Sequence, residues 1–137
     1  MKTISPKAGN HCFGCGAENP FGLKLAFEGD PDQNRVWVEL QALPFMAGAI
    51  GMMHGGFIAL LLDEASSKVL SLQEKQGVTR NIEVAYEKPV PLGHPIRVQA
   101  NLINQEGRKH FIEAQILNSN GDVLAKSNAL FLTFTSK

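Results

Sequence analysis

The stretch HGGFIALLLDEASSKVLSL, residues 54–72, decides the fold of this 137-residue chain. At about 100° per residue, a helix from Gly56 to about Leu72 gathers most of its apolar side chains in one broad stripe. The stripe contains Phe57, Ile58, Leu61, Leu62, Ala65, Val69 and Leu72. Leu60 and Leu70 fall outside it, so the helix is apolar nearly all round and needs a second cover besides a single sheet. Gly77 is expected to end this segment.

Alternating apolar residues on both sides of the helix predict β-strands. Two strands precede it, at 23–27 and 35–40 with a turn at 29–33, and four follow it, at 79–88, 96–102, 112–116 and 123–134. Asn120-Gly121 is typical of a hairpin turn. One helix with six strands predicts an α+β fold whose sheet is mostly antiparallel. We expect one domain over residues 1–137, in which residues 1–22 form a loop rich in Cys, Gly and Pro.

Composition and charge exclude several classes of protein. Thirteen basic and thirteen acidic residues leave no net charge, which disfavours nucleic acid as a partner. The longest apolar run, Phe57 to Leu62, is far shorter than a membrane span. Met1 to Asn10 lacks the apolar core of a signal peptide. We therefore expect a soluble, cytoplasmic domain with no membrane partner.

His54-Gly55-Gly56 opens the predicted helix and is the first candidate site. Glycines allow a ligand to approach the backbone, and N–H groups at a helix N-terminus stabilise a developing oxyanion. A loop that needs glycines only to turn is the alternative. Asp63 strengthens the functional interpretation, because it lies about 170° from the centre of the apolar stripe, near Leu60 and Leu70. A carboxylate with such neighbours loses solvation.

Other polar residues of the chain are interpreted as surface groups. Glu64 has Lys68 at i+4, which is typical of a solvated helix pair. His94 lies in a turn and His110 at a hairpin, and both are expected to be solvated.

Cys12-x-x-Cys15, next to His11, has three interpretations. A structural loop is favoured, because one such pair supplies only two of the four ligands that structural zinc needs. His11 and a second subunit are possible sources of the others. A redox pair is less favoured, because these motifs usually begin a helix, whereas this one precedes Gly16 and a turn. We expect no metal and no cofactor; no nucleotide-binding loop or nucleophile elbow is present in the sequence.

The His54-Gly55-Gly56 motif with Asp63 nine residues after the histidine resembles the signature of hotdog-fold acyl-CoA thioesterases. The resemblance is greatest to the phenylacetate-pathway and 4-hydroxybenzoyl-CoA thioesterase-like branch. The prefix from His11 to Leu23, with two cysteines and Asn19-Pro20, is similar to that of one subgroup. The resemblance implies a hotdog fold, in which a long central helix is wrapped by the sheet.

The resemblance also implies roles for individual residues. Gly56 would donate its backbone N–H to the thioester oxygen, and His54 would shape that loop. Asp63 would be general base or nucleophile, and Thr79 would orient the attacking water. Some relatives carry an asparagine six residues before the histidine, where this chain has Gly48, so that residue's role does not transfer.

The expected reaction is hydrolysis of an acyl-CoA to a carboxylic acid and free CoA, in a homodimer or a dimer of dimers. Candidate substrate-binding residues are Gly55, Arg80, Lys88, Arg97 and Arg108. Two alternatives stay open: an acyl-CoA-binding or regulatory protein without turnover, and a hotdog dehydratase or hydratase. The length of the acyl chain and its aliphatic or aromatic character are not predicted.

Overall fold

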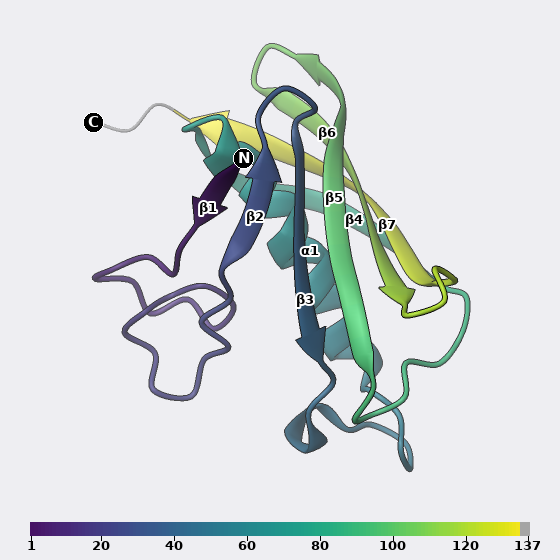
Figure 1. Ribbon diagram of the computed structural model, residues 1–137. Coiled ribbons are helices and arrows are strands. Elements are labelled where there is room, and N and C mark those ends of the chain that lie inside the picture. The colour runs from purple at the N-terminus through teal and green to yellow at the C-terminus, as the bar shows by residue number, and fades with distance from the viewer. Residues whose placement is uncertain (135–137) are drawn as a thin grey trace.

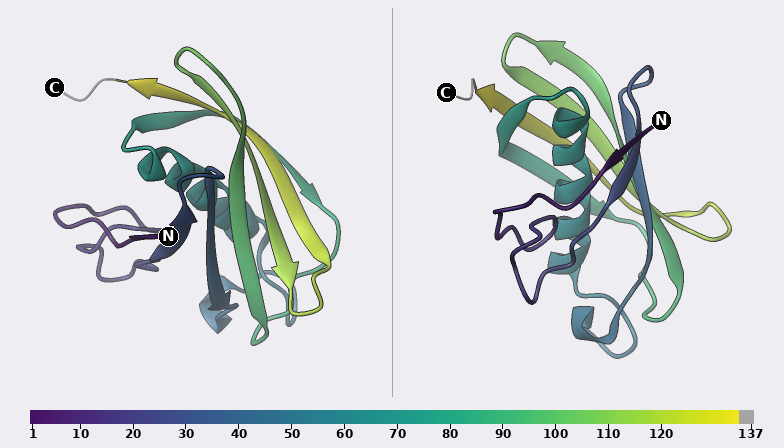
Figure 2. Two further views of the ribbon diagram at one scale, coloured as in Figure 1. Left: turned by 45° about the horizontal axis from the view of Figure 1, so that its top comes forward. Right: turned by 60° about the vertical axis from the view of Figure 1, so that its left-hand side comes forward.

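The computed structural model describes residues 1–134 and contains one long helix and a curved antiparallel sheet (Figure 1). The helix α1 spans Gly55–Leu72, and a short 3-10 helix, η1, spans Pro44–Met46. The seven strands follow the order β1-β2-β3-β5-β6-β7-β4 across the sheet. They are β1 Lys2–Ile4, β2 Phe27–Asp30, β3 Arg35–Gln41, β4 Gln76–Tyr86, β5 Pro95–Glu106, β6 Lys109–Asn118 and β7 Val123–Phe134. Figure 2 shows the sheet wrapping around α1, which confirms the predicted hotdog arrangement.

The core lies between α1 and the concave face of the sheet. Four residues of the predicted stripe are completely buried: Leu61, Leu62, Ala65 and Val69. Leu70, outside the stripe, is also buried, as expected for a helix with more than one cover. The helix ends at Leu72 rather than at Gly77, which lies in β4. The described residues contain no helix with the length and hydropathy of a membrane span.

Two boundaries before the helix differ from the prediction. The segment 23–26 is irregular, and β2 begins only at Phe27 and continues through Gly29 and Asp30, where a turn was expected. The N–H groups of Leu23 and Leu25 donate to the carbonyls of Phe13 and Gly14. The alternation in 23–26 therefore reflects pairing with the N-terminal loop, and only Phe27 belongs to the sheet. The three-residue strand β1 was not predicted.

The N-terminal loop lies against α1 on a side that the sheet leaves open (Figure 2). Backbone hydrogen bonds give it a defined shape: Lys7 N–H donates to the Cys15 carbonyl, and Gly16 N–H donates to the Cys12 carbonyl, both at 2.8 Å. This loop supplies part of the second cover that the apolar helix requires.

Strand β4 is an edge of the sheet and contains a bulge. Thr79 pairs with Phe131 and Asn81 pairs with Leu130, so Arg80 is the extra residue between them. A bulge lets two residues of one strand face a single residue of its neighbour. The side chain of Thr79 consequently lies on the same face of the sheet as the buried ring of Phe131, toward α1.

Candidate active site

The glycines at the start of α1 leave the backbone open to approach. His54 is the N-cap residue, and its Nδ1 accepts a hydrogen bond of 2.8 Å from the N–H of Gly56. Beyond its own helix turn, a Cβ added at Gly56 would meet only the His54 ring within 4 Å, at 3.1 Å, among the residues that the structure describes. The Gly55 carbonyl accepts a hydrogen bond from the Tyr86 hydroxyl at 3.1 Å, which fixes the first turn against β4. In this structure the Gly56 N–H is engaged by the exposed imidazole.

Asp63 lies near the middle of α1 and is bound by Thr79. The Thr79 hydroxyl donates to Asp63 Oδ1 at 2.7 Å, a short distance typical of a charge-assisted hydrogen bond. Partial burial raises the pKa of Asp63, the hydrogen bond from Thr79 opposes that shift, and the nearby charge of Glu64 adds to it. The bulge in β4 is what places Thr79 toward the helix. Both residues are candidates from the sequence, and the structure brings them into contact.

A cleft of about 650 Å³ opens beside this pair. Its walls come from α1, from the first residues of β4 and from the N-terminal loop, and they include Asp63, Thr79, Lys75 and Cys12. The cleft therefore holds a carboxylate that is fixed by a neighbouring hydroxyl and open to a ligand.

The structure does not bring Gly56 and Asp63 to one point. Seven residues along a helix correspond to about 10.5 Å. Neither His54 nor Gly56 lines the cleft that contains Asp63. Within one chain the two halves of the predicted site are therefore separate.

None of the four basic candidates lines this cleft: Arg80, Lys88, Arg97 and Arg108. Arg97 lies 3.2 Å from the Glu39 carboxylate, and Arg108 Nε donates to the Thr133 carbonyl at 2.8 Å. Lys88 lies in a separate pocket of about 460 Å³. Arg80 is exposed at the bulge, one residue from Thr79.

The prediction that Glu64 faces solvent is wrong. Glu64 is 8% exposed and Lys68 1% exposed, and Lys68 Nζ lies 3.1 Å from Glu64 Oε1. The expected i+4 pair does form, but the N-terminal loop covers it. Gly14 approaches so closely that an added Cβ would overlap the Glu64 carboxylate. An irregular loop has no periodicity from which this cover could be inferred.

The prediction that His110 is solvated is also wrong, whereas His94 is exposed as expected. His110 is fully buried, with Nδ1 3.3 Å from the Arg108 carbonyl and Nε2 3.4 Å from Lys75 Nζ. A neutral ring protonated on Nδ1 satisfies both contacts. Burial lowers the pKa of His110, the Lys75 charge lowers it further, and the Arg108 carbonyl opposes them.

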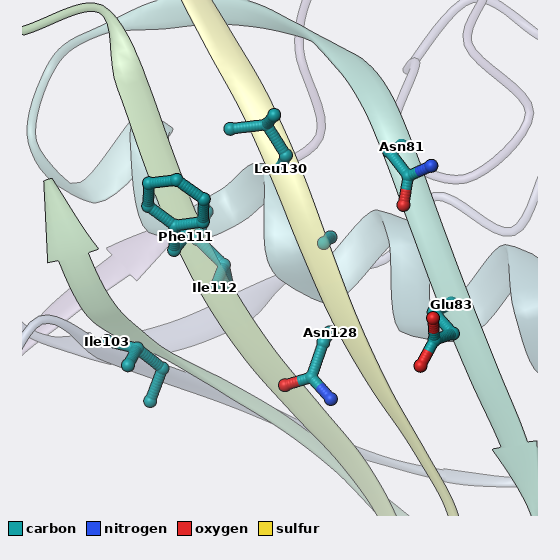
Figure 3. Close-up of a pocket in the computed structure, with 8 residues that line it drawn as sticks. Asn81, Glu83, Ile103, Phe111, Ile112, Asn128 and Leu130 are labelled. Atoms are coloured by element: carbon teal, nitrogen blue, oxygen red, sulfur yellow. The ribbon is translucent and has the colours of Figure 1, made fainter. Parts of the chain in front are cut away.

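A further pocket of about 340 Å³ lies on the face of the sheet that points away from α1 (Figure 3). The labelled side chains in Figure 3 project from β4, β5, β6 and β7, with the helix behind the sheet. Asn81, Glu83 and Asn128 are its polar members, beside the apolar Phe111 and Leu130. This pocket lies across the sheet from Asp63, and the resemblance assigns it no residue.

Comparison with known proteins agrees with the fold and with the motif. The model of the thioesterase superfamily matches residues 50–125, which include both halves of the candidate site, and the chain belongs to this family. It is 32% identical to acyl-coenzyme A thioesterase THEM4 of Mus musculus over 84% of this chain and 50% of that protein. The chain thus spans about half the length of the curated relatives it matches first.

Solved structures show the same fold. A thioesterase superfamily protein superposes with a TM-score of 0.79 at 29% identity, over 85% of this chain and 60% of that one. A hypothetical thioesterase of Streptococcus pneumoniae, solved with coenzyme A, has a TM-score of 0.75 at 21% identity, over 81% and 86% of the two chains. The second likeness concerns the fold alone.

Proposed function

We propose that this protein is an acyl-CoA thioesterase that hydrolyses an acyl- or aryl-CoA to the free acid and CoA. The observation that carries the proposal is the Asp63–Thr79 hydrogen bond of 2.7 Å in an open cleft, on the helix that begins with the His54-Gly55-Gly56 turn. Family membership and the acyl-CoA thioesterases among the relatives support the same reaction.

The residues divide the chemistry between them. The thioester oxygen accepts a hydrogen bond from the Gly56 N–H. The substrate carbonyl thereby replaces the His54 imidazole as the acceptor of this N–H. Asp63 acts as general base toward water, or attacks the carbonyl carbon itself, while Thr79 holds the carboxylate in position. In either route the carbon–sulfur bond breaks, and the thiolate of CoA departs and takes up a proton. The nucleophilic route leaves a mixed anhydride on Asp63, which water then hydrolyses to the free acid and the restored carboxylate. Because a thiolate leaves readily, the reaction needs no metal or cofactor.

We infer that the working unit is a homodimer or a dimer of dimers. One thioester cannot contact two groups that lie about 10.5 Å apart on one helix. Strand β4 is an eleven-residue sheet edge with Val78 and Tyr86 exposed, and such an edge can pair with a second copy. Antiparallel pairing would bring two α1 helices side by side. Gly56 of one subunit would then meet Asp63 of the other.

The CoA portion would lie near the edge strand. Gly55, which has no side chain, would let the pantetheine pass close to the backbone. Of the basic candidates, we favour Arg80 for the phosphates, because it is exposed one residue from Thr79. Arg97 and Arg108 already have partners, and Lys88 belongs to a separate pocket.

We place the reaction in the cytoplasm, where free thiols stay reduced.

Release of free thiol from a panel of aliphatic and aromatic acyl-CoAs, followed with a chromogenic thiol reagent, tests the proposal. Asp63→Asn keeps the shape but removes the base, and kcat should fall by roughly 10²- to 10⁴-fold. Asp32→Asn, an exposed residue of the same type in the β2–β3 turn, is the matched control and should leave kcat unchanged. Tight binding of acyl-CoA without thiol release would instead favour the non-catalytic alternative.

Subunit mixing tests the composite site. Gly56→Pro deletes the amide hydrogen, and proline is tolerated in the first turn of a helix. Mixing this inactive variant with inactive Asp63→Asn should restore up to one working site in each heterodimer. Inactive mixtures, despite subunit exchange verified by mass spectrometry, would contradict the proposal, as would a monomer mass near 14.9 kDa in light scattering.

A further inference from the structure

Two thiols and a carboxylate meet where the N-terminal loop packs on α1. The Sγ atoms of Cys12 and Cys15 and a carboxylate oxygen of Glu64 all lie within 4.8 Å of one another. Cys12 Sγ is 3.8 Å from Glu64 Oε2. Both cysteines are free, Cys15 is buried and Cys12 is partly buried. The proposed hydrolysis uses none of these three groups.

The loop holds the two cysteines in a fixed arrangement. Cys12 N–H donates to Asn10 Oδ1 at 2.7 Å, and Gly16 N–H donates back to the Cys12 carbonyl at 2.8 Å. The Cys15 carbonyl accepts the N–H of Lys7 at 2.8 Å. Gly16 is packed against backbone, because a Cβ there would overlap Asn10 and Cys12. The geometry of the thiols is therefore set by the backbone and not by each other.

The third donor changes the interpretation of the cysteine pair. From sequence, Cys12 and Cys15 supply two ligands and Glu64 was expected in solvent. In the structure Glu64 turns inward from α1, and its buried Oε1 has no hydrogen bond of good geometry, although the Lys68 ammonium lies 3.1 Å away. Three donors from two separate elements thus converge on one buried point.

We propose that Cys12, Cys15 and Glu64 bind a thiophilic divalent cation of the zinc class. Zinc binds thiolate at about 2.3 Å and carboxylate at about 2.0–2.2 Å in tetrahedral sites, which requires about 3.8 Å between the sulfurs and about 3.5 Å between sulfur and oxygen. The observed upper limit of 4.8 Å means that the sulfurs close in by about 1 Å or less, and a sulfur and the carboxylate oxygen by about 1.3 Å or less. Water from the adjoining cleft, which Cys12, Cys15 and Glu64 all line, completes the fourth position.

The buried charges balance when the cation is bound. Two thiolates, one carboxylate, one ammonium and one divalent cation sum to zero. Lys68 therefore allows three anionic ligands to surround one cation in a buried place, where an uncompensated charge is expensive. The cation would fasten the N-terminal loop to α1, and the proposed hydrolysis does not require it.

A disulfide between Cys12 and Cys15 is the competing use of the same thiols. It would not involve Glu64, and the convergence of the carboxylate on both sulfurs favours the metal. The two uses differ in thiol count, in metal content and in their response to a change at Glu64.

The test starts from full-length protein that has been treated with chelator and kept reduced with a phosphine. Equilibrium dialysis against zinc, with elemental analysis, should give about one zinc per chain and release about two protons. Cobalt in its place should show thiolate-to-metal charge-transfer absorption with the intensity of two sulfur ligands. Zinc should also raise the melting temperature of the wild-type protein.

Variants assign the ligands. Cys12→Ser with Cys15→Ser should abolish binding, and Glu64→Gln should weaken it at least about 10-fold. Glu18→Gln, an exposed carboxylate of the same loop, is the matched control and should bind as the wild type does. Absence of stoichiometric zinc in the reduced wild type would overturn the proposal, and so would unchanged affinity in the double cysteine variant. If that variant does not fold, cobalt absorption without sulfur charge transfer in the wild type overturns it equally.

Discussion

The buried ion pair between Glu64 and Lys68 allows a quantitative test of how the N-terminal loop and the helix depend on each other. The two side chains are 10% and 2% exposed. Removal of one member leaves the other charge buried without its partner, which typically costs about 3–5 kcal/mol. Glu64→Gln and Lys68→Met should therefore each remove a large part of a total stability of roughly 5–15 kcal/mol. For a chain of this size, the melting temperature should fall by about 10–20 °C.

The double variant distinguishes this mechanism from simple loss of packing. Glu64→Gln combined with Lys68→Met leaves no buried charge, so its free energy of unfolding should lie closer to the wild type than either single variant does. Chemical denaturation of metal-free, reduced protein, followed by circular dichroism, measures all four members of the cycle. Glu39→Gln breaks the largely exposed pair with Arg97 and is the control, with an expected loss below about 1 kcal/mol. A double variant that loses the sum of the two single losses would refute the reasoning.

Three further outcomes follow from contacts at the site and in the core. Thr79→Val removes the hydroxyl bound to Asp63, and kcat should fall roughly 10- to 100-fold with little change in KM; an unchanged kcat in the thiol-release assay would contradict this role. His110 has a lowered pKa in the folded protein, so below about pH 6.5 the unfolded chain takes up a proton that the native state does not. Stability should fall as the pH drops from 7.5 to 5.5 in urea denaturation, and His110→Gln should lose less over that interval; equal losses would show that His110 does not contribute. Gly14→Ala should cost about 1–3 kcal/mol, because its Cβ overlaps the Glu64 carboxylate; a melting temperature equal to that of wild type would exclude this contact.

The helix and most of the strands could be predicted because their patterns are local. The alternation of Ile96, Val98 and Ala100, for example, reports directly which face of β5 is buried. The position of Asp63 opposite the apolar stripe of the helix also follows from helical periodicity. The resemblance singled out Thr79 only as a residue that orients water. Its contact with Asp63 depends on the bulge in β4, which no periodicity predicts.

The burial of Glu64 and His110 could not be predicted, because it depends on segments that are distant in sequence. Glu64 is covered by a loop about fifty residues earlier, whose shape comes from hydrogen bonds to backbone groups. His110 is enclosed together with Lys75, which lies between α1 and β4. In both cases the side chain looks like an ordinary surface residue until its long-range partner is known.

The bulge at Arg80 determines which face of the sheet each residue of strand β4 occupies. From Ile82 onward the even-numbered residues of β4 face α1, whereas before the bulge the odd-numbered residues, such as Thr79, do so. A regular ladder that kept every residue would turn Thr79, and each residue before it, to the outer face. Deletion of Arg80 would instead leave Thr79–Phe131 and Asn81–Leu130 as consecutive pairs, so Thr79 would still face α1. The Asp63–Thr79 contact should consequently depend on the register of β4 with β7 and survive the loss of Arg80.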